Sequence, residues 1–295
     1  MNYKIDDQQL KITIDEEFSG QSLAELFDYF CLSSKWKYLL MQEKKVLLNG
    51  QVLTDSDVIL NSGDELTFLN EESQIDFPLA SESCEVVYED DFVYIAHKKA
   101  GDIIHDDTSV DALANQAARY QYEHHIDAPV HYIHRLDRET SGLVLFVKYP
   151  LFNAYYDRKL AEKEIQRYYL AIVKGKGNEG YQATFKDPIG RDRHHSGRYI
   201  VYPKGKSAVT HIKVLRKKGP YLLVEAHLET GRTHQIRVHL AYHNMPIVND
   251  DLYGIKDAHF PAMGLWAYKI IFDDPLTHEM IEVRDHDNEM FNEFN

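Results

Sequence analysis

Residues 134–148 have the sequence HRLDRETSGLVLFVK, and the rest of the fold is best predicted outward from this stretch. Its second half is a continuous apolar run that is typical of a buried strand. Thr140, Ser141 and Gly142, just before that run, favour a tight turn with local side-chain hydrogen bonds. Asp137 has an arginine on each side, so we expect an ionised carboxylate on a loop beside a rigid strand. By itself, such an aspartate is more typical of a surface ion pair worth about 0–1 kcal/mol.

Strands dominate the chain on both sides of this loop. Apolar and β-branched runs predict further strands at 86–98, 167–175, 207–217 and 221–229. One clear helix is predicted at 110–125, and a second begins near His234 and ends before Pro246. Because most neighbouring strands have no helix between them, we expect an α+β class with a mainly antiparallel mixed sheet. We assign this catalytic domain to residues 83–295.

A smaller α/β domain is expected at residues 11–72. Two amphipathic stretches at 22–30 and 33–44 predict helices, the first with Ser22 as its N-cap. Asn49-Gly50 between two short apolar runs is a strong hairpin signal. Residues 73–82 have little periodicity and contain a proline, so we interpret them as a linker.

The charge of the chain is unevenly distributed. The formal net charge is -14, but residues 1–90 contain 19 acidic and 6 basic residues. Residues 186–239 have the opposite balance, with 12 Lys/Arg against 4 Asp/Glu. A local basic region indicates an electrostatic footprint for nucleic acid better than the overall sum does, although a solvated basic face would look the same.

The composition also bears on compartment. Cys31 and Cys84 are the only cysteines and lie far apart, which fits a reducing cytoplasm and predicts neither a disulfide framework nor a cysteine zinc site. No apolar run approaches the roughly 18 residues of a membrane span, and the first residues do not resemble a signal peptide. We expect a cytoplasmic monomer.

Four segments in order resemble the RluA-type RNA pseudouridine synthase family. The stretch HRLDRETSGLVLFVK resembles its active-site loop, and RYYLAIVKG (167–175) resembles a strand with a basic residue followed two later by tyrosine. PIGRD (188–192) with GKSAVT (205–210), and LETGRTHQIRVHLAYHNMPIVNDDLYG (228–254), resemble its later segments. The resemblance implies an isomerase that converts specific uridines in RNA to pseudouridine without a cofactor.

The same resemblance implies roles for individual residues. Asp137 would be the catalytic aspartate, and Arg237 would pair with it and keep it ionised. Tyr169 would lie against the uracil and could help to move the proton on carbon 5. Ile236 would pack beneath the base, and Arg135 would fill the gap that the extruded uridine leaves in the RNA. Taken singly, each of these residues also fits an ordinary structural position.

Three further residues are expected to bind substrate or shape the site: His134, Thr140 and His234. The histidine-rich stretch around His234 and His239 also suggests a metal site. However, two histidines five apart do not share a helical face, and no HExxH motif is present. We therefore expect no metal.

The N-terminal unit resembles the S-four-type RNA-binding domain in its NG hairpin and its later GD turn. Such domains use a basic helical face, and here only a few lysines are available for it: Lys35, Lys37, Lys44 and Lys45. A retained fold with weak RNA affinity is the alternative.

The chain departs from the family pattern at several positions. His97-Lys98-Lys99 replaces Asn-Lys-Pro, Asp106 replaces a proline, Trp266 replaces a histidine, and Asp274 replaces the histidine of a His-Pro pair. These changes concern RNA contacts and target choice. Ribosomal RNA is the expected target and transfer RNA the closest alternative. A non-catalytic RNA-binding or ribosome-assembly protein and a His/Asp metal hydrolase are the rival hypotheses.

Overall fold

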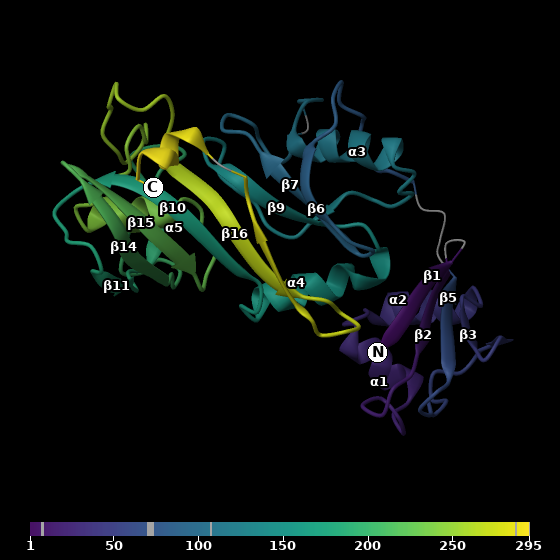
Figure 1. Ribbon diagram of the computed structural model, residues 1–295. Coiled ribbons are helices and arrows are strands. Elements are labelled where there is room, and N and C mark those ends of the chain that lie inside the picture. The colour runs from purple at the N-terminus through teal and green to yellow at the C-terminus, as the bar shows by residue number, and fades with distance from the viewer. Residues whose placement is uncertain (7–8, 70–73, 107, 287, 295) are drawn as a thin grey trace.

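The computed structural model describes residues 1–295 except 7–8, 70–73, 107, 287 and 295. It has two parts, a small sheet with two helices and a long curved sheet with helices beside it (Figure 1). The expected α+β class with a mainly antiparallel sheet is confirmed.

The small part is a five-stranded antiparallel sheet carrying two short helices. Its strands, in spatial order, are β1 (Asn2–Asp6), β2 (Gln9–Thr13), β5 (Glu65–Leu69), β3 (Val46–Leu48) and β4 (Gln51–Val52), and its helices are α1 (Leu23–Tyr29) and α2 (Ser34–Gln42). Ser22 caps α1 as predicted, in a capping box with Glu25. The predicted hairpin turns at Asn49 and Gly50, which both have the positive φ that such a turn needs.

The structure differs from the expected layout at both ends of this unit. A domain start at residue 11 would fall inside β2, because β1 pairs along its whole length with β2. The expected linker begins at residue 73, which lies outside the described residues, but its later part is packed. The side chain of Asn115 donates to the carbonyl of Pro78 over 2.8 Å, and Val130 N–H donates to Asp76 over 2.8 Å. The described linker therefore lies against the large part of the molecule.

The large part is built on a ten-stranded sheet. Its main path runs β11 (Gln182–Phe185), β14 (Thr210–Lys218), β15 (Tyr221–Leu228), β10 (Gln166–Lys174), β16 (Leu265–Asp273), β9 (Ser141–Val147), β7 (Val93–Lys98) and β6 (Glu85–Glu89). Two short strands join it at the side, β8 (His131–Tyr132) on β9 and β17 (Met280–Arg284) on β16. A separate hairpin consists of β12 (Ile189–Arg191) and β13 (Tyr199–Val201). Strands β9 and β16 form the sheet's parallel contact, at the centre of the molecule.

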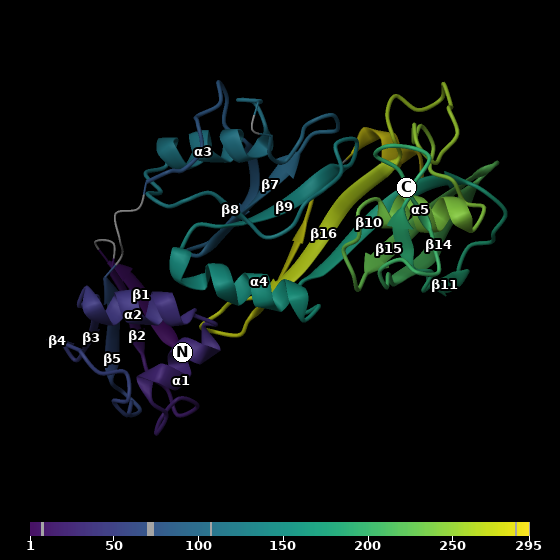
Figure 2. The ribbon, with the colours of Figure 1, turned by 180° about the vertical axis from the view of Figure 1, so that it is seen from behind.

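Helices α3 (Leu113–Glu123) and α5 (Gln235–Tyr242) confirm the two predicted in this part. Helix α4 (Asn153–Ala161) was not predicted, and it lies between the large sheet and the small part (Figure 2). It has no side-chain cap and is held by its buried Tyr155 and Tyr156, so packing rather than a local signal accounts for it. The described residues also include two 3-10 turns, η1 (Pro150–Phe152) before α4 and η2 (Glu289–Phe294) near the C-terminus.

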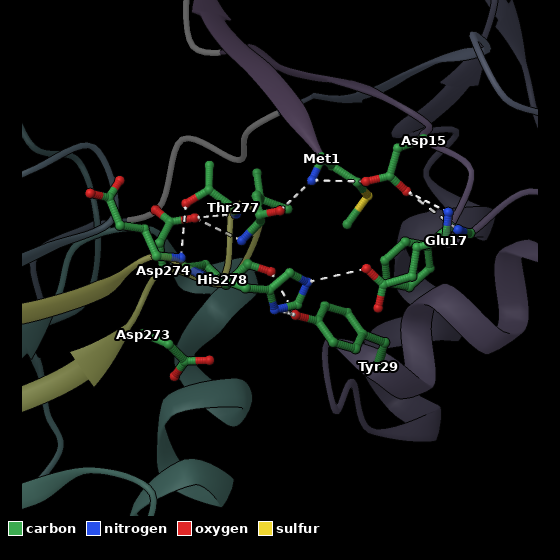
Figure 3. A network of polar contacts seen from close by, with 12 residues as sticks. Met1, Asp15, Glu17, Tyr29, Asp273, Asp274, Thr277 and His278 are labelled. Atoms are coloured by element: carbon green, nitrogen blue, oxygen red, sulfur yellow. Dashed lines mark hydrogen bonds and ion pairs between the residues drawn. The ribbon is translucent and has the colours of Figure 1, made fainter.

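One continuous apolar core joins the two parts. The rings of Phe30 and Phe152 meet edge to face at 5.3 Å between centroids, and those of Tyr3 and Phe92 lie 4.9 Å apart. Polar contacts also join the two parts (Figure 3), including a 2.9 Å hydrogen bond from the Tyr29 hydroxyl to the carbonyl of Pro275. The small part therefore packs directly against the large part and is not connected to it by the chain alone.

No helix among the described residues is both long enough and apolar enough to cross a membrane.

Candidate active site

Asp137 lies on the loop between β8 and β9, as the sequence predicts. The N–H of Thr140 donates to the carbonyl of Asp137 over 3.1 Å, which closes the turn before the strand. Gly142 has a φ of 116°, and an added Cβ there would lie 2.3 Å from the carbonyl oxygen of Ala267. Only glycine therefore permits the close parallel contact of β9 with β16 that anchors the loop.

A fully buried lysine fixes the other side of the loop. Lys98 Nζ donates to three backbone carbonyls, those of Lys99 (2.9 Å), Asp102 (2.7 Å) and Arg138 (2.9 Å). Burial lowers the pKa of Lys98 to about 8, opposed in part by nearby carboxylates. Three acceptors match the three hydrogens of an ammonium group. A charged Lys98 therefore fixes the backbone at Arg138, the residue that follows Asp137.

Arg237, from the first turn of α5, bridges two carboxylates. Its Nη1 donates to Asp137 Oδ2 over 3.1 Å. Its Nε and Nη2 form a fork to Asp250, over 2.8 and 2.9 Å. Burial disfavours the charged guanidinium, but the bonds and charge of Asp250, with those of Asp137, outweigh it and raise the pKa of Arg237.

The two carboxylates differ in exposure. The side chain of Asp250 is 1% exposed, and it also accepts from the backbone N–H groups of Leu252 and Tyr253. The side chain of Asp137 is 23% exposed. Among the described residues, no donor is assigned to its second oxygen, Oδ1. Asp250 therefore holds Arg237 in place, and Arg237 holds an Asp137 that still has a free oxygen.

Asp137, to which this free oxygen belongs, lines a cavity of about 950 Å³. All eight residues predicted for the site line it: Arg135, His134, Asp137, Thr140, Tyr169, His234, Ile236 and Arg237. They come from the β8–β9 loop, strand β10 and the start of α5. The cavity is large enough for a nucleotide, in the usual range of 300–1,000 Å³ for small-ligand sites.

Tyr169 and Ile236 form buried apolar walls of the cavity, 4% and 3% exposed. Burial raises the pKa of the Tyr169 hydroxyl, so it keeps its proton at neutral pH. A flat ring and a branched aliphatic group suit the two faces of a planar base.

His134 is buried and uncharged. Burial lowers its pKa to about 3, helped by the charge of Arg167. Its Nε2 accepts a long 3.4 Å hydrogen bond from Leu145 N–H, so part of its role is to hold the loop against β9. Arg135 is exposed at the cavity.

His239 lies apart from these residues. Its Nδ1 pairs with the hydroxyl of Thr210 and its Nε2 with the carbonyl of Asp187, each at 2.9 Å. His239 therefore holds α5 to the sheet. It does not line the cavity that His134 and Asp137 line.

The comparisons with known proteins agree with this geometry. A family profile described as RNA pseudouridylate synthase matches residues 92–242. An RNA pseudouridine synthase of Bacillus subtilis, YhcT, is 35% identical over 92% of this chain and 91% of its own length. The chain belongs to the RNA pseudouridylate synthase family.

Other relatives of the synthase extend the match to both parts of the chain. A second profile, the N-terminal domain of the RluD ribosomal pseudouridine synthase, matches residues 10–66. The ribosomal large subunit pseudouridine synthase D of Vibrio parahaemolyticus is 32% identical over 94% of this chain and 88% of its own length. The human RNA pseudouridylate synthase domain containing 1 shares the fold, with a TM-score of 0.59 and 24% identity over 73% of this chain and 88% of its own.

Sequence reasoning missed three residues of the synthase site: Lys98, Asp250 and Tyr253. Lys98 is the last residue of β7 and follows His97 directly, so the local sequence did not mark it as a buried charge. Asp250 and Tyr253 lie within the quoted 228–254 segment, but only the folded structure brings them to Arg237.

Proposed function

We propose that this synthase isomerises specific uridines of ribosomal RNA to pseudouridine, with Asp137 as its catalytic group. The observation that carries the proposal is the partly exposed Asp137 carboxylate, held by Arg237 and lining a nucleotide-sized cavity. Ribosomal RNA is favoured because the Vibrio relative is named for the large ribosomal subunit. Transfer RNA is the closest alternative.

In the reaction, the bond between ribose C1′ and uracil N1 breaks, the uracil turns, and C1′ rejoins at C5. The hydrogen leaves C5 and a proton is taken up at N1, so the atoms balance without a redox step or a hydrolytic water. Asp137 acts at the sugar, and Arg237 pairs with its carboxylate. Tyr169 lies against the base and is placed to assist the proton transfer from C5, while Ile236 supports the other side.

The target uridine must leave the RNA stack, at a cost of a few kcal/mol. Arg135 offsets part of that cost by entering the gap. Tyr169 contributes stacking, which is typically worth about 1–3 kcal/mol. His134 and Thr140 shape the loop around Asp137, and His234 faces the same cavity.

RNA binding by so acidic a chain requires a local basic surface. The β12–β13 hairpin and the turn after it carry four cations with no carboxylate partner among the described residues: Arg191, Arg193, Lys204 and Lys206. Arg198 of the hairpin lies within electrostatic range of Asp192. Arg167 and Arg232 add two more at the cavity. By contrast, Lys37 and Lys45 of the N-terminal part are paired with acidic neighbours. We propose that the hairpin side binds RNA phosphates more strongly than the N-terminal part does.

The proposal includes action as a cytoplasmic monomer without a metal ion. Cys31 and Cys84 are both free thiols, which fits a reducing compartment. If chelation abolished activity, the metal-free mechanism would be wrong and the hydrolase alternative would return.

The test is to map pseudouridine across total RNA from cells with and without this protein. We expect one or a few ribosomal sites to disappear and to return with the wild-type gene. Loss confined to transfer RNA would overturn the target. Loss at no site, together with no product from purified enzyme on bulk RNA, would leave the non-catalytic RNA-binding hypothesis.

A further inference from the structure

Tyr253 lies between the catalytic arginine and the basic hairpin. Its ring is within cation–π distance of two guanidinium groups, 5.3 Å from Arg237 and 5.5 Å from Arg198 of the hairpin. Its backbone N–H donates to Asp250, which itself holds Arg237. The position is tightly built, because a Cβ added at the next residue, Gly254, would lie 2.1 Å from the carbonyl of Ile247.

The hydroxyl of Tyr253 makes two hydrogen bonds of 2.8 Å. One comes from the backbone N–H of Tyr199 in the hairpin, which can only donate. The other joins it to Nδ1 of His234. The hydroxyl oxygen could accept a second bond, but its own hydrogen also needs an acceptor, and of the two partners only Nδ1 can accept. The arrangement that satisfies every group therefore has the Tyr253 O–H donating to Nδ1.

The ionisation of both groups agrees with that direction. Burial raises the pKa of Tyr253, so the hydroxyl keeps its hydrogen at neutral pH. Burial also lowers the pKa of His234, in spite of the nearby charge of Asp137, so the ring is uncharged. A neutral imidazole whose Nδ1 accepts must carry its hydrogen on Nε2.

The backbone also places His234 unusually. It precedes α5 in the left-handed region, with a φ of 58° and a ψ of 22°. Its ring packs edge to face on both Tyr199 and Tyr253, each at 5.6 Å between centroids. The ring is therefore fixed on the hairpin side, while the residue lines the same cavity as Asp137.

We propose that Tyr253 is a positioning residue that holds His234 with its hydrogen on Nε2, as a donor to an acceptor atom of the nucleotide in the cavity. Its ring holds Arg237 from the other side. One side chain thus orients groups on both sides of Asp137 and ties them to the hairpin. This inference rests on the proposed function, because it concerns how that site is arranged for its substrate.

The first test compares Tyr253→Phe and Tyr253→Leu with Tyr242→Phe, a matched control on α5 whose ring is 58% exposed. Tyr253→Phe removes both hydrogen bonds of the hydroxyl, and loss of the one to His234 should slow single-turnover pseudouridine formation on the order of ten-fold. The RNA dissociation constant should change by no more than about twofold. Tyr253→Leu should be slower still, and Tyr242→Phe unchanged. A wild-type rate in Tyr253→Phe, or a loss confined to RNA affinity, would overturn the inference.

The second test replaces His234 by amides. Glutamine offers an N–H near the position of Nε2, and asparagine offers one near Nδ1. Asparagine tolerates the left-handed backbone better, so it should fold at least as well. We expect His234→Gln to keep more activity than His234→Asn in spite of that advantage, and the reverse order would contradict the tautomer.

A third measurement separates this inference from the proposed function. Nitrogen NMR of ¹⁵N-histidine-labelled protein distinguishes the two neutral tautomers, with His234 assigned by its loss in His234→Gln. The wild type should show the Nε2–H form, and Tyr253→Phe should show a mixture. An unchanged spectrum in Tyr253→Phe would refute the role of Tyr253. Failure of the wild type to make pseudouridine would instead refute the proposed function.

Discussion

The active site and the junction between the two parts both gather charged groups, but they satisfy them differently. At the junction, Asp15 is bound by the amino group of Met1 and by backbone N–H groups, and Asp274 by the N–H groups of Leu276 and Thr277 (Figure 3). The polar groups at the junction thus have partners within the protein, beside the apolar core that the two parts share. At the active site, Asp137 has one strong partner and one oxygen toward a cavity.

The difference indicates what each region is for. Satisfied polar groups around packed rings stabilise a fixed arrangement of two parts. A carboxylate that is held firmly yet left partly open has been kept available for another molecule. Variants at the junction should therefore change stability more than rate, and variants at the active site should change rate in every case.

The largest expected effect comes from Arg237→Met. It leaves Asp250 buried without its cation and frees Asp137, so we expect a loss of about 3–5 kcal/mol in stability and no detectable product. Urea unfolding and a pseudouridine assay measure the two. Arg158→Met, which breaks an exposed pair with Glu162, is the control and should unfold at nearly the same urea concentration as wild type. Pseudouridine formation by the Arg237→Met enzyme would contradict the proposed difference between the active site and the junction.

Phe30→Ala tests the junction. Phe30 is fully buried and contacts Phe152 across the two parts, so its removal should cost about 3–5 kcal/mol of unfolding free energy. The folded fraction should keep nearly its full single-turnover rate, measured well below the melting temperature. A rate loss as large as that of an active-site variant would show that docking of the small part also shapes the cavity, through α4.

Lys98→Met should have an intermediate effect. It leaves three carbonyls without their donor, and an unsatisfied buried group costs about 1–3 kcal/mol, offset in part by removing a buried charge. We expect slower turnover and faster hydrogen exchange in the loop around Asp137. Unchanged exchange there would mean that Lys98 does not hold the loop.

The smallest effect concerns pH and the pair His97–Asp285, whose Nδ1 and Oδ2 lie 2.7 Å apart. Burial opposes the charged imidazole, but the bond and charge of Asp285 outweigh it and raise the pKa of His97 above its ordinary 6.5. Because the pKa of His97 is higher in the folded state, its protonation stabilises the folded protein, and this contribution is fully present below pH 6.5. The contribution is lost as the pH rises through the pKa of His97 in the folded state. Unfolding free energy measured against pH should show this decline in wild type and not in His97→Asn.

Local signals predicted most of the fold. The N-cap at Ser22, the Asn49-Gly50 turn and the apolar run after Gly142 each specify a nearby backbone shape, and the structure contains all three. Helix α4 and the docked junction were not predictable in this way. They depend on rings that meet only after folding, such as Tyr29 with Tyr155.

The site divides in the same manner. The motifs identified the residues that line the cavity, because each motif is short and continuous. The link from Arg237 to Asp137 joins residues 100 apart in sequence, and here the family resemblance supplied the pairing. The clamp by Lys98 and the contacts of Tyr253 had no sequence pattern that predicted their geometry.

The most direct test of the central claim is Asp137→Asn in a single-turnover assay on ribosomal RNA, with RNA affinity and melting temperature measured on the same samples. The replacement keeps size and most hydrogen bonding but removes the charge that Arg237 faces. We expect no pseudouridine, with RNA binding and fold retained. Product formation by the Asp137→Asn enzyme would contradict the assignment of the chemistry to this carboxylate.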